Sequence, residues 1–208
     1  DLFEANFYSD NRKRLRTLFQ GTAPIVITAN GLLQQGGDNT YKFHQDGSFY
    51  YLTGIDKPDV LLVIDKEKEY LILPEQDFYD NVFNGTLQAE EFTKISGITV
   101  VLDNKVGWKK LAARLKKVKH YATLAALPSY VESHSFYANP ARAALIDKVK
   151  DLNQSAEPLD LRQHLSIMRM VKQAPEIAAI QQAVDITIGS IKDLQRKLPT
   201  LDNEFQVE

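Results

Sequence analysis

The sequence of 208 residues contains no cysteine. Disulfide bonds, thiolate nucleophiles and zinc sites built on thiolates are therefore excluded, and the absence points to a cytoplasmic setting, where disulfides are rare. An excess of charge of one sign is also lacking, because 25 Lys and Arg residues nearly balance 27 Asp and Glu residues, for a net charge of −2. Such a chain has no general attraction for phosphate backbones, so we expect no nucleic-acid partner.

Long apolar runs and catalytic spacings are missing as well. No segment approaches the ~20 apolar residues that a membrane-spanning helix needs, so we expect no membrane partner. No GxSxG sequence marks a nucleophilic serine. The histidines show none of the HxH, HxxxH or HExxH spacings of metal sites; they are His44, His120, His134 and His164. We therefore assign no catalytic residue and no metal ligand to this chain.

The segment richest in information is FHQDGSFYYLTG, at Phe43–Gly54. Its aromatic residues predict a buried strand at 49–52, because each buried ring removes about 150–250 Å² from water. Gly54 follows where such a strand must bend or end. A plain core strand leaves the preceding polar residues unexplained; these are His44, Gln45, Asp46 and Ser48.

Two runs in this sequence carry a resemblance to a known family. YKFHQDGSFYYLTGIDKPDVLLVI, which contains this segment, resembles the signature of the creatinase-like N-terminal domain of the Xaa-Pro aminopeptidase (aminopeptidase P) family. There an aromatic, a basic residue and Gln precede an aromatic strand, Thr-Gly and an acidic Pro turn. LRQHLSIMRMVKQAPEIAAIQQAVDIT, at 161–187, resembles the segment that leads into the family's catalytic domain. The resemblance covers nearly the whole chain, although residues 85–153 carry little that is diagnostic.

Alternating helical and strand periods predict an α/β fold, with a layered mixed β-sheet flanked by helices. The resemblance implies the creatinase N-terminal version of this fold. With 44% hydrophobic residues, the chain can bury one substantial core. We expect GLLQQGGDN to be a glycine-rich loop and DKEKE to join two adjacent strands. Helices are predicted at 7–19, 88–95, 108–115 and from Pro140, and further strands at 24–29, 59–64, 70–73, 98–102 and 121–127.

A domain boundary is predicted at NQSAEP, residues 153–158, which interrupts the apolar pattern. Residues 1–153 then form the N-terminal domain. Residues 154–208 form a linker and the first helices of a second domain, which the resemblance identifies as a truncated pita-bread domain. After Pro175, apolar residues keep helical spacing from Ile177 to Leu198, which predicts a long helix with an apolar stripe. An uncovered stripe of this length favours self-association or docking.

The resemblance implies a parent enzyme that removes the N-terminal residue preceding proline. In the family, two divalent metals, manganese in our expectation, are held by two Asp, one His and two Glu of the pita-bread domain. Those ligands would lie beyond Glu208, so we expect a piece of a larger hydrolase that is inactive by itself. Its role is then structural, oligomerising and cleft-forming. The implied partners are the catalytic domain, further copies of the chain and peptides with penultimate proline.

Three positions are carried into the substrate cleft by the resemblance. Asp38 matches an acidic residue near a subsite in related enzymes, or it is a turn residue beside two glycines. Phe83 falls where relatives place Trp in a Trp-x-Gly-x-Arg pattern, and it is either a cleft wall or a core residue. The Arg position of that pattern is Leu87 here, which removes the polar contact. His44 stands where relatives have Arg or His, and we expect it to brace an interface between domains.

Other readings of the same architecture stay open. A prolidase would cleave only dipeptides, and a creatinase would act without metal. FHQDGSFYYLTG is more typical of the peptidases. A binding module, as in histone-chaperone subunits that keep the architecture without catalysis, is the alternative from another class.

Overall fold

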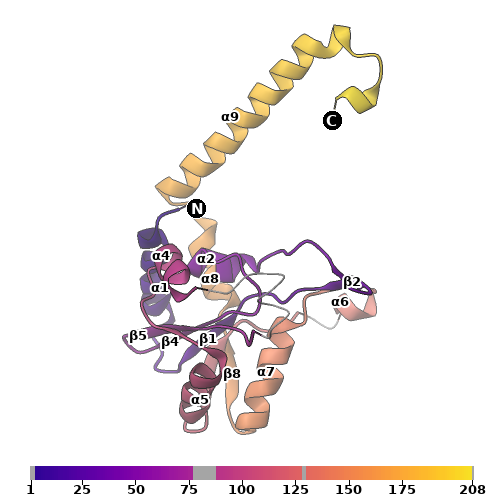
Figure 1. Ribbon diagram of the computed structural model, residues 1–208. Helices are drawn as coiled ribbons and strands as arrows, with labels where there is room; N and C mark the ends of the chain where they lie inside the picture. The colour runs from indigo at the N-terminus through magenta and orange to yellow at the C-terminus, as the bar shows by residue number, and fades with distance from the viewer. Residues whose placement is uncertain (1–2, 77–87, 128–129, 208) are drawn as a thin grey trace. The chain divides into compact units, whose positions relative to one another are not determined.

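The computed structural model describes residues 3–76, 88–127 and 130–207. These residues form two compact units, one from Phe3 to Met168 and one that begins at Arg169. The first unit contains the mixed sheet predicted from the sequence, with helices on both of its faces (Figure 1). The predicted fold class is therefore confirmed.

The main sheet has six strands among the described residues, in the order β6, β5, β4, β1, β7, β8. Their bounds are β1 Ile25–Thr28, β4 Leu61–Asp65, β5 Lys68–Ile72, β6 Val101–Leu102, β7 His120–Thr123 and β8 Glu157–Asp160. β4 pairs antiparallel with β1 and with β5. The pairing of β4 with β5 was predicted, because DKEKE joins these two strands. β1 pairs in parallel with β7, and β7 with β8. Because β1 and β7 run in the same direction, the chain leaves both strands at the same end of the sheet, where their C-termini lie.

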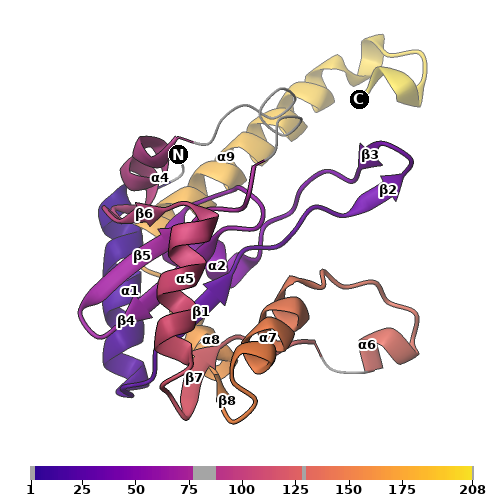
Figure 2. The same ribbon diagram turned by 60° about the horizontal axis from the view of Figure 1, so that its bottom comes forward.

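Helices cover the two faces of this sheet (Figures 1 and 2). On one face lie α1 Ala5–Phe19, α2 Gly47–Thr53, α4 Ala89–Ser96 and α8 Arg162–Met170. On the other lie α5 Asn104–Leu115 and α7 Ala141–Leu152, with the short α6 Tyr130–Ser133 preceding α7. Each face has its own apolar cluster. Phe49 and Leu165 belong to the first cluster, and Leu111 and Val149 belong to the second.

The aromatic segment that we predicted to be a strand is a helix, α2. The Asp46 carboxylate caps its start by accepting hydrogen bonds from the backbone N–H groups of Ser48 and Phe49, at 2.9 and 3.0 Å. Gly54 ends the helix with a φ of 70°. The strand prediction was wrong because it weighed the β-propensity of the aromatic residues and overlooked the N-cap aspartate and the C-terminal glycine. Most of the large side chains of α2 lie in the core, as expected.

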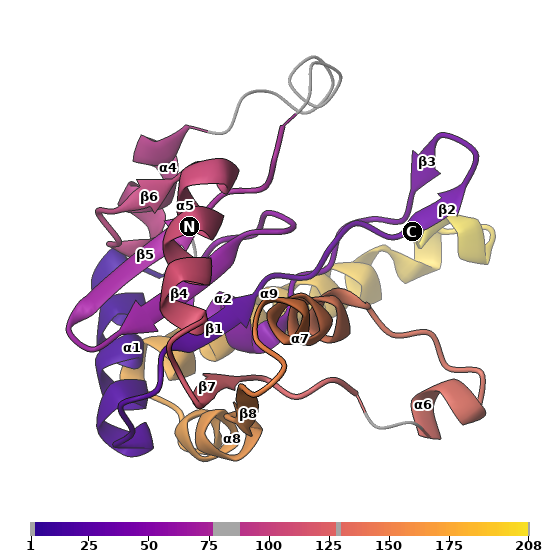
Figure 3. The same cartoon turned by 90° about the horizontal axis from the view of Figure 1, so that it is seen from below.

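The glycine-rich segment that was expected to be a loop forms a small hairpin. β2 Gln34–Gly36 pairs antiparallel with β3 Asn39–Thr40, and Asp38 lies in the turn between them. We call residues 31–44 the arm. The arm follows the C-terminal end of β1, extends away from the sheet and returns to the start of α2 (Figures 2 and 3). Every residue from 34 to 42 is exposed.

The sheet continues past residue 153, where the sequence suggested a domain boundary. β8 pairs in parallel with β7, and Leu165 and Met168 of α8 join the apolar cluster on the α1 face. The first compact unit therefore reaches Met168. NQSAEP leads from α7 into an edge strand of the same sheet. The assignment of 154–208 to a linker and the beginning of a catalytic domain stays a prediction.

The second unit consists mainly of one long helix, α9 Ala174–Lys197, followed by the 3-10 turns η1 Leu198–Thr200 and η2 Glu204–Gln206. Pro175 lies in its first turn, as predicted, and the Gln173 backbone N–H donates to Glu176 Oε2 at 2.9 Å. The apolar stripe of α9 is exposed, with Ile177 57% and Ile191 52% accessible. Within the described residues, no helix has the length and apolar character that crossing a membrane requires.

Candidate functional site

The polar residues that precede α2 form a hydrogen-bond network with Gln45 at its centre. The Gln45 Oε1 accepts from the backbone N–H groups of Asn30 and Asp46, at 3.0 and 2.8 Å. Its Nε2 donates to the carbonyl oxygens of Ile55 and Lys57, at 3.0 and 2.9 Å. The amide thus makes two bonds through its oxygen and two through its nitrogen, which uses its full capacity. Gln45 thereby ties Asn30, the second residue after β1, to the segments before and after α2.

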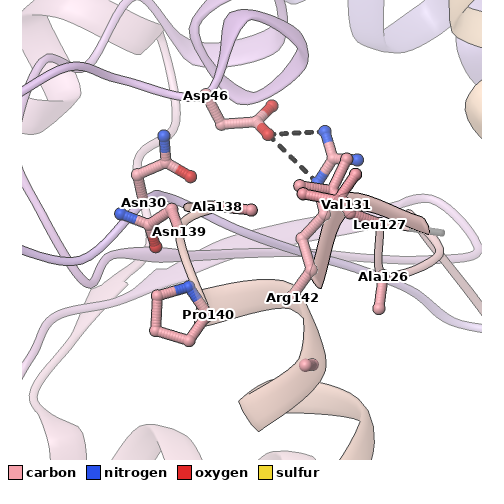
Figure 4. A pocket seen from close by; sticks show the side chains of 10 residues that line it. Asn30, Asp46, Ala126, Leu127, Val131, Ala138, Asn139, Pro140 and Arg142 are labelled. Atoms are coloured by element: carbon pink, nitrogen blue, oxygen red, sulfur yellow. Dashed lines mark hydrogen bonds and ion pairs between the residues drawn. The ribbon is translucent and has the colours of Figure 1, made fainter. Parts of the chain in front are cut away.

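Asp46 pairs with a cation that comes from the opposite face of the sheet. Arg142, in the first turn of α7, donates from Nη2 and Nε to Asp46 Oδ2, at 2.6 and 3.1 Å (Figure 4). The Asp46 side chain is only 8% exposed, and its other oxygen caps α2. A buried carboxylate is costly unless it is paired, so Arg142 compensates the charge that Asp46 brings into the interior.

Asn139, just before α7, holds the first residue of the arm. Its Nδ2 donates to the Gly31 carbonyl oxygen at 2.7 Å, and its Oδ1 accepts from the Gly31 N–H at 3.1 Å. The same Oδ1 accepts from the Ala141 N–H at 3.2 Å. Asn30 completes the link, because its Nδ2 donates to the carbonyl oxygen of His44 at 2.9 Å. The two ends of the arm are therefore joined to each other, and the first is bonded to α7.

Four residues of this network, Asn30, Asp46, Asn139 and Arg142, line a cavity of about 340 Å³ (Figure 4). Its wall combines the polar side chains of the network with apolar ones, among them Ala126, Leu127 and Pro140. The cavity lies where the chain leaves the parallel strands β1 and β7, which is where open α/β sheets bind ligands. The polar side chains in the wall bond to one another and to the backbone. This arrangement suits a structural junction rather than a reactive group.

The loop after β7 is held by charged side chains on both sides of Ala125. The Ala125 N–H donates to Asp160 Oδ1 at 3.1 Å, and its carbonyl oxygen accepts from Arg142 Nη1 at 3.4 Å. Asp160 also accepts from the backbone N–H and the Nε of Arg162, at 3.0 and 2.8 Å. Burial alone would raise the pKa of Asp160. The hydrogen bonds from Arg162 and Ala125 and the charge of Arg162 outweigh burial and place this pKa below its ordinary value.

Two of the three positions predicted for a substrate cleft are among the described residues, and they lie in different parts of the arm. Asp38 is exposed in the turn at the tip of the arm. His44 is exposed at the base of the arm, so the structure does not bring these two side chains together. Phe83 lies outside the described residues. The cleft roles of all three residues stay predictions.

Sequence reasoning missed Asn139 and Arg142. An asparagine directly before the predicted helix start at Pro140 was a usable capping signal. Nothing in a single sequence could pair Arg142 with Asp46, because 96 positions separate them.

The histidines do not gather. His44, His120 and His134 are exposed, and the ring of His164 packs edge-on against that of Phe19, with centroids 5.9 Å apart. Across residues 3–76, 88–127 and 130–207, no group of three or more His, Asp or Glu side chains is arranged to hold a metal ion. The chain therefore offers no ligand set, within these ranges, for the pair of metals that the resemblance implies.

Comparisons with known proteins identify relatives of this chain. The Xaa-Pro aminopeptidase of Haemophilus influenzae is 27% identical over 206 residues, which are 97% of this chain and 44% of that protein. Xaa-Pro aminopeptidase 3 of Rattus norvegicus is 29% identical over 175 residues, which are 78% of this chain and 33% of that protein. The chain thus spans less than half the length of these relatives.

The fold is shared with solved structures. A Bacillus anthracis protein assigned as an aminopeptidase P superposes with a TM-score of 0.79 and 23% identity, over 91% of this chain and 46% of that one. A family model described as "Aminopeptidase P, N-terminal domain" matches residues 8–123, which is more than half of the chain. The chain therefore belongs to the family of aminopeptidase P N-terminal domains.

Proposed function

We propose that this chain is the leading part of an Xaa-Pro aminopeptidase, a hydrolase that removes the N-terminal residue preceding proline. The observation that carries the proposal is the alignment with the Haemophilus influenzae enzyme, which takes in 97% of this chain. In this proposal the two divalent metals, manganese in our assignment, are bound outside the chain. The metals would activate the hydrolytic water, and the chain's own residues would shape the cleft.

The proposed role of the chain is structural, oligomerising and cleft-forming. The exposed arm supports this role, because it extends away from the sheet (Figure 3) and carries Asp38 in the exposed turn between β2 and β3, where another domain or another copy of the chain can meet it. His44 at the base of the arm would brace that interface, and Phe83 would form a wall of the cleft. The proposed partners are the catalytic domain, further copies of the chain and peptides with penultimate proline, in the cytoplasm.

A direct test separates the chain from its parent enzyme. The 208-residue chain is mixed with manganese and an Xaa-Pro peptide, and release of the first residue is followed, with the parent enzyme as the positive control. We expect release by the parent enzyme alone. Release by the chain that a chelator abolishes would overturn the assignment of catalysis to residues outside it. No release by the parent enzyme would overturn the proposed reaction.

A further inference from the structure

The arm contributes little to its own placement. Its residues from 34 to 42 are exposed, and a Cβ added at Gly36 or Gly37 would meet no atom within 4 Å. The pairing of β2 with β3 sets the internal shape of the hairpin. It does not set the direction in which the hairpin points, because, among the residues that the structure describes, neither apolar cluster includes a residue of the arm. That direction must depend on the residues at the base of the arm.

Asn139 fixes the beginning of the arm through one residue. It bonds both the N–H and the C=O of Gly31, at 3.1 and 2.7 Å. A single hydrogen bond would leave the backbone free to rotate about it, whereas two bonds on either side of one Cα hold both adjoining peptide planes. Gly31 also suits this position by its size, since a Cβ there would lie 2.9 Å from Asp59 Oδ1.

Arg142 fixes the other end of the arm. Its Nη2 and Nε donate hydrogen bonds to Asp46 Oδ2, at 2.6 and 3.1 Å. Gln45, the residue before Asp46, accepts a hydrogen bond from the Asn30 N–H at 3.0 Å. Arg142 lies in the first turn of α7, and Asn139 lies two residues before that helix. That helix is rigidly placed, because Leu145 and Val149 are buried in the apolar cluster beneath the sheet.

We infer that Asn139 and Arg142 are positioning residues that set the direction of the arm and, with it, the location of Asp38. The arm is thus aimed by a helix on the opposite face of the sheet from α2. The part of this inference that concerns substrate rests on the proposed function. The part that concerns the arm does not.

The placement of the arm can be measured without any activity. Because the chain has no cysteine, Gln35→Cys on the arm and Lys109→Cys on α5 allow a pair of spin labels to be attached specifically. The distance distribution between the labels is recorded for the otherwise unchanged chain and for Asn139→Ala, Asn139→Asp and Arg142→Lys. Asn139→Asp keeps the acceptor for the Gly31 N–H and loses the donor. Circular dichroism establishes that each variant is folded.

A matched control lies at the other end of the same helix. Asn153 follows α7 and bonds the carbonyl oxygens of Leu115 and Val118, at 2.9 and 3.0 Å. Asn153→Ala therefore removes the same kind of bonds at a distance from the arm. We expect Asn139→Ala to broaden the distance distribution about twofold, Asn139→Asp and Arg142→Lys to broaden it less, and Asn153→Ala to leave it unchanged. An unchanged width in the folded Asn139 and Arg142 variants, or equal broadening by Asn153→Ala, would overturn the inference.

Kinetics of the parent enzyme then separate this inference from the proposed function. If Asp38 lines the cleft, Asn139→Ala raises the KM for an Xaa-Pro peptide about tenfold, with a smaller change in kcat and with metal content unchanged. Broadening together with raised KM supports both statements. Broadening with unchanged KM supports the positioning role and refutes the cleft role of Asp38.

Discussion

The arm and helix α2 are neighbours in the sequence and differ in almost every physical respect. The arm is exposed along its strands, whereas α2 buries Phe49 and Leu52 completely and is capped at both ends. One of the two runs that resemble the family contains α2. Gln45 and Asp46 of that run bond to the backbone around α2 and to α7, and most of its large side chains in α2 lie in the core. The arm has the less distinctive sequence and the more accessible side chains. This difference indicates that the residues around α2 form a scaffold that holds the arm.

The largest expected loss of stability comes from Arg12→Ala, which tests whether the residues around α2 form a scaffold. This α1 side chain is fully buried, donates to the Leu52 carbonyl oxygen of α2 at 2.8 Å and to both oxygens of Glu69 at 3.0 and 2.9 Å. Arg12→Ala leaves these groups without their partner and should lower the free energy of unfolding by about 3–5 kcal/mol. Arg16, 3.6 Å from Glu69 and more accessible, is the control, and Arg16→Ala should cost less than about 1 kcal/mol. Equal losses in urea denaturation would contradict the scaffold role of Arg12.

A pair of glycines compares the two regions directly. A Cβ at Gly54, where φ is 70°, would lie 2.4 Å from the ring of Tyr8, whereas a Cβ at Gly36 on the arm would meet nothing. Gly54→Ala should therefore cost about 2–4 kcal/mol of unfolding free energy from backbone strain and overpacking. Gly36→Ala should change it by less than about 0.5 kcal/mol. Thermal unfolding of both variants measures the two losses. Similar unfolding midpoints would contradict the difference in packing between α2 and the arm.

The junction between the two regions should show an intermediate effect. Asp46→Asn keeps a capping oxygen for α2 but removes the charge that faces Arg142, so we expect a loss of about 1–2 kcal/mol. Asp103 caps α5 by accepting from the Val106 N–H at 2.9 Å, and it is exposed. Asp103→Asn should cost less than about 0.5 kcal/mol. If the two substitutions cost the same in chemical denaturation, the ion pair adds nothing to the cap.

Asp38→Asn should have the smallest effect on stability. It also tests directly whether the arm contributes to the proposed cleft. Asp38→Asn changes an exposed turn residue and should alter the free energy of unfolding by less than about 0.5 kcal/mol. In the parent enzyme, the same substitution should raise the KM for an Xaa-Pro peptide by about threefold or more, because the proposed cleft loses a charge. Gln35→Ala, also exposed on the arm, should leave KM unchanged. Identical kinetics for both variants would remove Asp38 from the cleft.

Local patterns in the sequence were enough to predict the layered fold. Pro140 and Gly97 marked helix ends where the structure has them, and the charged DKEKE turn joins β4 and β5. The α2 segment was misread because aromatic residues favour strands by only a small margin, which the cap at Asp46 and the C-terminal Gly54 outweigh. The junction at the arm lay beyond prediction. Its bonds join residues about a hundred positions apart, and no local pattern records such a pairing.

The bond between Gly31 and Asn139 also has a consequence for synthesis of the protein. These residues are 108 positions apart, so a ribosome that adds roughly 5–20 residues per second needs roughly 5–20 s to proceed from one to the other. Late in that interval the hairpin emerges from the ribosome, while its anchor does not yet exist. A nascent chain halted before residue 139 should therefore carry the arm without a fixed direction, and release of the halt should fix that direction.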